Sequence, residues 1–126
     1  MKLAALGLTA LLIVSTAFAH HSPIVFDRTK QVTITGTVTE FRWGNPHSWI
    51  HIDVADKDGK VGNWAVEMDP ASHLAREGWK SSTLKPGDKI SVTFRPMKDG
   101  SNGGMFMNAR RPTGEVLSMT GQPIDP

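Results

Sequence analysis

The stretch that decides the fold is "VTITGTVTE", residues 32–40. Valine and isoleucine alternate with threonine along it, and β-branched residues with a period of two are typical of a strand. Gly36 interrupts the run, and a glycine inside a strand often marks a bend or a bulge. The stretch therefore predicts a long and strongly curved first strand, as a small barrel requires.

Similar alternation follows along the chain and predicts more strands at 48–54, 63–68, 89–95, 105–111 and, more briefly, 115–118. Asp69 before Pro70 is typical of a helix start, with a capping carboxylate and a proline at the first helical position. The helix would run to about Glu77, and Gly78 would end it. An all-β chain with one short helix between its third and fourth strands has the order of an OB-fold, a five-stranded Greek-key barrel. A generic antiparallel sandwich is the alternative.

The first 19 residues have the features of a signal peptide. Lys2 is followed by an apolar run at 3–14, and Ala17-Phe18-Ala19 is a small-x-small cleavage site. The run is shorter than the roughly 20 residues that span a membrane, so we expect no membrane insertion. We expect cleavage after Ala19 and a periplasmic protein with an N-terminal arm at 20–30 and a single domain at 31–126.

The charge balance and the lack of cysteine exclude several classes of function. The leader carries one of the 14 lysine and arginine residues, which leaves 13 basic against 12 acidic side chains in the mature chain. They are interspersed, so we expect no nucleic-acid partner, which would need a clustered basic surface. The absence of cysteine excludes disulfides, thiolate metal sites and cysteine nucleophiles. No catalytic motif occurs, so we expect that the protein is not an enzyme.

Histidines supply the candidate metal ligands. Cleavage after Ala19 would give His20 a free α-amine beside its imidazole, and His21 could complete a chelate for Cu(II). His47 and His51 share a strand face, but four residues of strand span about 13 Å. Ligand bonds of about 2.0–2.1 Å cannot bridge that distance, so only one of these two histidines could join a metal site, unless Pro46 forces a bulge or the arm folds over. The alternative is that His20 and His21 are solvated residues of an unstructured terminus.

The turn "WGNPH" (43–47) supplies a candidate ligand surface. Trp43 and Trp49 are the tryptophans that we expect to be exposed, and Asn45 lies between them in the chain. Alternatively, the asparagine only stabilises the turn and the tryptophans belong to the core.

Three segments carry a family resemblance: "HHSPIVFD" (20–27), "NPHSWI" (45–50) and "LKPGD" (84–88). In this order they resemble a family of small exported bacterial proteins of unknown function, over essentially the whole mature chain. The resemblance implies export and a compact β domain, and it supplies no catalytic residues.

A weaker similarity is to the periplasmic copper chaperones of cation-efflux systems, which are also OB barrels. Those proteins combine histidine, methionine and tryptophan, for which this chain offers His51, Trp64 and Met68. Their close methionine pair is missing from the third strand, where Val66 stands instead, and Met105 and Met107 form such a pair only on the fifth strand.

These observations favour a small exported binding protein. The first hypothesis is copper binding through the histidine terminus, helped by His47 or His51. The second is a metal-free module that holds a protein or a small ligand on the tryptophan and "NPHSW" surface.

Overall fold

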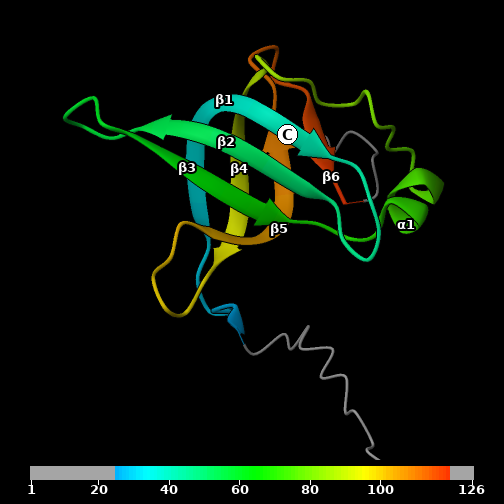
Figure 1. Cartoon of the computed structure of the whole chain (residues 1–126), viewed down its shortest axis with the longest axis horizontal. Coiled ribbons are helices and arrows are strands. Elements are labelled where there is room, and N and C mark those ends of the chain that lie inside the picture. Colours follow the sequence, from blue (N-terminus) through cyan, green and yellow to red (C-terminus); the bar gives the residue numbers. More distant parts are fainter. Residues whose placement is uncertain (1–24, 120–126) are drawn as a thin grey trace, which may run out of the picture.

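Strand β1 (Val32–Arg42) is the longest element of the computed structural model, which describes residues 25–119. Its first half pairs with β4 (Lys89–Pro96) and its second half with β2 (Trp49–Ala55), both antiparallel. The two pairings meet at Thr37, which lies opposite both Lys89 and Asp53. The strand curves through this point, and Figure 1 shows it bending around the molecule.

The sheet closes on itself. Strand β3 (Val61–Glu67) pairs with β2, and β5 (Gly103–Arg110) pairs antiparallel with β4 and parallel with β3. The circle β1-β2-β3-β5-β4, with helix α1 (Ala71–Arg76) between β3 and β4, is an OB-like barrel. The predicted fold is confirmed, and the sandwich alternative is wrong. A short strand, β6 (Val116–Ser118), extends the sheet beyond β5. The ends of β2 to β6 lie within two residues of their predicted positions.

Gly36 has a different role from the predicted bulge. A Cβ atom at Gly36 would lie 2.1 Å from the carbonyl oxygen of Asp53, so the missing side chain lets β2 approach β1 closely. The register irregularity lies between Val38 and Glu40, where Thr39 is the extra residue. The bulge therefore follows the glycine by three residues.

The barrel interior is apolar, and α1 covers one end of it, opposite the projecting β2–β3 hairpin (Figure 1). Leu74 of α1 and Trp79 just after it are buried, and the indole Nε1 of Trp79 donates to the carbonyl oxygen of Ser118 at 3.0 Å. The remaining buried cluster comes from the strands and the connections between them: Ile34, Val38, Ile50, Ile52, Val66, Met68, Leu84, Ile90, Val92, Phe94, Phe106, Ala109 and Leu117.

The start of α1 differs from the prediction. Pro70 is the N-cap, no side chain caps the helix there, and the carboxylate of Asp69 instead contacts His73 Nδ1 at 2.8 Å. The predicted capping by Asp69 is therefore wrong. The side-chain oxygen of Asn45, in the β1–β2 loop, accepts a hydrogen bond from the amide of Ser72 at 3.4 Å. The helix ends at Arg76, close to the predicted end.

The described part of the arm docks on the barrel. Phe26 is buried and forms a β-bridge with Met97, and the amide of Asp27 donates to the carbonyl oxygen of Pro96 at 2.8 Å. His20, His21 and the predicted leader lie outside the described residues. Within residues 25–119, no helix has the length and apolar character needed to cross a membrane.

Candidate functional site

The outer face of β2 carries the predicted site residues. Ile50 and Ile52 are fully buried in the barrel, so Trp49 and His51 point outward. Beyond the bulge at Thr39, alternate residues of β1 also point outward. They place Glu40 opposite His51 and Arg42 opposite Trp49. On the other side of β2, Ala65 and Glu67 of β3 lie opposite the same two residues.

Trp49 is half-buried and makes a cation–π contact. The guanidinium carbon of Arg42 lies 5.8 Å from the centroid of its ring, within the range of about 6 Å for such contacts. Arg42 thus covers part of the indole, and together the two side chains offer an apolar surface beside a positive charge.

His47 is held by β3. Its Nδ1 lies 3.0 Å from the carbonyl oxygen of Met68 and 3.1 Å from Oε1 of Glu67. Both neighbours are acceptors when Glu67 is ionised, so Nδ1 carries a proton whether or not the imidazole is charged. The loop that positions His47 is closed by buried Ser48, whose hydroxyl donates to the carbonyl oxygen of Gly44 at 3.3 Å.

His51 has a separate environment. Its Nε2 lies 4.0 Å from Oε2 of Glu40, and within the described part of the chain this buried nitrogen has no hydrogen-bond partner. His47 and His51 therefore contact different carboxylates. Residues 25–119 contain no group of three or more histidine, aspartate or glutamate side chains arranged to hold a metal ion.

Two hollows meet at Trp49. The loop hollow, of about 260 Å³, is lined by Arg42, Gly44, Asn45, Pro46, His47 and Trp49. The arm groove, of about 200 Å³, lies on the other side of the indole. It is lined by Val25, Phe26, Trp49, Ala65, Glu67, Met97 and residues 101–104. Val25 is 44 % exposed there. Trp49 is common to both hollows, so a ligand lying across it would contact the loop and the arm together.

The other candidate residues lie elsewhere. Trp43 packs against the core and meets Phe41 edge-on at 5.8 Å between ring centroids, and it lines neither hollow. Trp64 and Met68 pack with the core, whereas His51 is on the outer face of the sheet. The trio suggested by the copper-chaperone similarity therefore does not converge on one ion.

Arg42 and Glu67 are the site residues that sequence reasoning missed. Glu67 could have been found, because Ala65 and Glu67 alternate with buried residues and their side of β3 continues the face of Trp49. Arg42 could not be found from a strict period of two, which places it inside the barrel.

Comparison with known proteins adds a family and a distant structural likeness. The profile of a family of unknown function, DUF6152, matches residues 9–108. No curated protein matches the sequence significantly. Among solved structures, the mitochondrial single-stranded DNA binding protein Rim1 from S. cerevisiae is similar at 12 % identity and a TM-score of 0.48. The match covers 66 % of this chain and 94 % of that one.

Proposed function

Since this chain belongs to the DUF6152 family of unknown function, we propose a function from the site itself: the protein binds a ligand on the outer face of β2, across Trp49. In this proposal it is exported, loses residues 1–19, and holds a small molecule or a segment of a partner protein without transforming it. The single observation that supports the proposal most is that Trp49 forms a wall of both the loop hollow and the arm groove.

The chemistry around Trp49 suits a ligand with an apolar body and a polar end. The indole, Val25 and Phe26 supply apolar surface, while Arg42 and Glu67 supply opposite charges on either side of the ring. Tryptophan and arginine are the residue types that dominate binding energy at protein interfaces. Charges of both signs fit no polyanion, so we still expect that the protein does not bind nucleic acid.

The experiment uses the processed, isotope-labelled protein and the soluble periplasmic fraction of its source organism, divided by filtration into small molecules and proteins. We expect one fraction to shift or broaden the indole N–H resonance of Trp49. Arg42→Ala should weaken this effect, because it uncovers the indole and removes the charge. The matched control is Lys80→Ala, which removes an exposed cation outside both hollows. If neither fraction perturbs Trp49, or if both variants behave alike, the proposal is wrong.

Copper binding by the histidine terminus is a second candidate, favoured by the environment of His47. The contacts of its Nδ1 with Glu67 and the carbonyl of Met68 are of the kind that orient metal-binding histidines in proteins. Val25 lines the same groove as Glu67, and residues 20–24 could span at most about 17 Å when extended. A terminus at His20 would therefore lie within about 17 Å of the groove that Glu67 lines.

Copper binding is tested by titrating Cu(II) into the processed protein and into a form with one extra N-terminal residue. The extension blocks the amine chelate and should weaken binding at least about tenfold, which corresponds to about 1.4 kcal/mol. His47→Gln should also weaken binding, whereas His73→Gln, on α1 and beside Asp69, should not. Equal affinity for the processed and extended forms would refute the chelate.

A further inference from the structure

A third hollow, of about 340 Å³, lies beside the β2–β3 hairpin, which projects from the barrel at the end away from α1 (Figure 1). We name it the mouth hollow. It is lined by Val54, Asp56, Lys60, Val61, Gly62, Trp64 and Asn102. Its volume is in the range of about 300–1,000 Å³ that small-molecule sites occupy. It shares one lining residue, Asn102, with the arm groove of the proposed Trp49 site, but no tryptophan and no charged residue.

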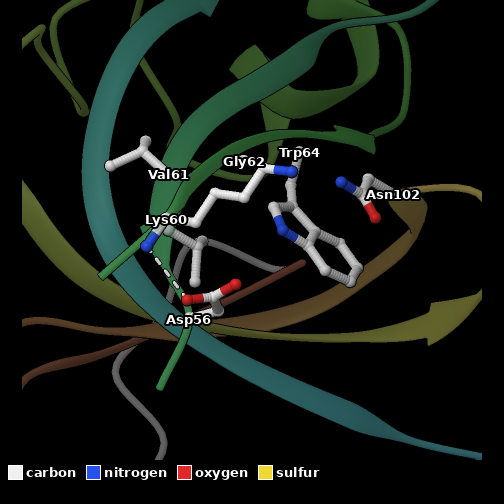
Figure 2. Close-up of a pocket in the computed structure, with 7 residues that line it drawn as sticks. Asp56, Lys60, Val61, Gly62, Trp64 and Asn102 are labelled. Atoms are coloured by element: carbon white, nitrogen blue, oxygen red, sulfur yellow. Dashed lines mark hydrogen bonds between the residues drawn. The ribbon is translucent and has the colours of Figure 1, made fainter. Parts of the chain in front are cut away.

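An indole forms the platform of the mouth hollow. Trp64 lies on the inner face of β3 and is partly exposed, and its ring packs against Phe94 at 5.8 Å between centroids. Gly62, two residues earlier on the same face, leaves the space beside the ring open. A Cβ atom there would lie 3.4 Å from Nδ2 of Asn102 and 3.9 Å from Nε1 of Trp64. Figure 2 shows the indole with the carboxylate of Asp56 and the amide of Asn102 on different sides of it.

Polar groups surround this platform. Oδ1 of Asp56 accepts hydrogen bonds from the amides of Asp58 and Lys60 at 2.8 and 3.0 Å, so the hairpin turn fixes the carboxylate. Within residues 25–119, no hydrogen bond or ion pair engages Oδ2 of Asp56, the ammonium of Lys60, the side-chain amide of Asn102 or the indole N–H of Trp64. These groups are therefore available to a ligand.

The charges of these groups, and their mixture of hydrogen-bond donors and acceptors, indicate the class of ligand. Asp56 and Lys60 carry opposite charges, so the lining suits a neutral molecule better than an anion or a cation. Donors come from Lys60, Asn102 and Trp64, and acceptors from Asp56 and Asn102, on several sides of one flat ring. A pyranose sugar matches this set, because its hydroxyl groups donate and accept around the whole rim while its C–H face can lie on the indole. A nucleobase presents hydrogen-bonding groups only in its own plane, so it matches donors and acceptors on several sides of the ring less well.

We propose that the mouth hollow is a saccharide-binding site, in which Trp64 stacks against a pyranose and Asp56, Lys60 and Asn102 bind its hydroxyl groups. The mouth hollow shares only Asn102 with the Trp49 site, and each site has its own tryptophan as reporter, so the failure of one can be told from the failure of the other. A bound sugar would also cover Val61, which is 58 % exposed.

The test is a titration of the isotope-labelled processed protein with glucose, galactose, mannose, N-acetylglucosamine and, separately, adenosine. The reporter is the indole N–H resonance of Trp64, assigned by its loss in Trp64→Phe. We expect a saturable shift with at least one of the sugars, with a dissociation constant in the millimolar range that is typical of a small half-open site.

Gly62→Val is the decisive variant, because its methyl groups would enter the hollow where a Cβ atom already reaches contact distance. It should weaken sugar binding at least about tenfold. Ala55→Val also places a valine on the hairpin, outside the lining, and should leave binding unchanged. Asn102→Ala is the second variant if Gly62→Val does not fold. The carbonyl oxygen of Asn102, which the substitution keeps, is the group that bonds the amide of Ala65.

Three results would overturn the proposal: no sugar shifts the Trp64 resonance saturably; adenosine does so but no sugar does; or a sugar-induced shift persists unchanged in both Gly62→Val and Asn102→Ala.

Discussion

Replacing Gly36 by alanine tests how the barrel is built. The Cβ atom of an alanine at this position would lie 2.1 Å from the carbonyl oxygen of Asp53, 3.0 Å from its carbonyl carbon and 3.1 Å from Cγ1 of Ile52. Folded proteins essentially never show Cβ contacts below 3.0 Å. Two of the three contacts are with backbone, which no side-chain rotation can relieve, so β1 and β2 would have to separate.

The loss in free energy of unfolding depends on which strand pairings the separation disturbs. Gly36 lies opposite Ile90, and its neighbour Thr37 lies opposite both Asp53 and Lys89, so a shift here strains both pairings of β1. Overpacking costs about 1–3 kcal/mol and occasionally more. The smaller entropy of the unfolded alanine chain offsets about 0.4–1 kcal/mol of that. We expect a net loss of about 1–2 kcal/mol, which for a domain of this size lowers Tm by roughly 4–16 °C.

The assay is urea unfolding followed by tryptophan fluorescence, with the free energy of unfolding taken from the midpoint and slope. The control is Gly62→Ala, on the neighbouring hairpin, where a Cβ atom would meet nothing closer than 3.4 Å. Its stability should stay within about 0.5 kcal/mol of the original or rise slightly. If Gly36→Ala were as stable as Gly62→Ala, the close approach of β2 would not be the reason for this glycine.

Two further predictions concern the arm and the helix. Hydrogen bonds from the hydroxyl and amide of Thr29 lower the pKa of Asp27 to about 2. Because this folded-state pKa lies below the unfolded value of about 3.9, the ionised carboxylate stabilises the arm above that value. The stabilisation is lost as pH falls through about 2. An NMR titration of the Asp27 carboxyl carbon should show this low pKa and its rise in Thr29→Val, and titration near the unfolded value would contradict it. Asn45→Ala removes the acceptor for the Ser72 amide and hydroxyl and should cost about 1 kcal/mol of unfolding free energy. Unchanged stability would show that Asn45 does not support α1.

Most of the fold could be predicted because each strand buries one face and so leaves a period of two in the sequence. The exception is the closure between β3 and β5, where β5 begins at Gly103 and not at Met105 as predicted. Glycines 103 and 104 suggest a flexible loop, yet Cβ atoms there would lie 2.4 Å from the carbonyl oxygen of Ala65 and 2.1 Å from that of Arg95. Both glycines are needed for close approach of backbones, and composition alone does not distinguish that need from flexibility.

The site was harder to predict than the fold because β1 contains one extra residue, Thr39, relative to β2. A period of two that starts at Val32 places Glu40 and Arg42 inside the barrel and Phe41 outside. The bulge at Thr39 reverses this order, since a shift of one residue exchanges the faces of a strand. Phe41 packs against the core, and Arg42 meets Trp49 on the outer face. The odd spacing from Val38 to Phe41 was the available signal of a bulge.

The register also explains why the two proposed sites can act independently. Trp49 lies opposite Glu67, and Trp64 lies opposite Ile52, so the backbone positions of the two tryptophans are three residues apart along the β2–β3 pair, about 10 Å. Three is an odd number, so the side chains also point to opposite faces of the sheet. Trp49 faces the loop and the arm outside the barrel, and Trp64 faces inward at its mouth. A ligand held by one indole therefore leaves the other uncovered. Asn102 lines both sites, so two partners can be held at the same time only if they do not both need that side chain.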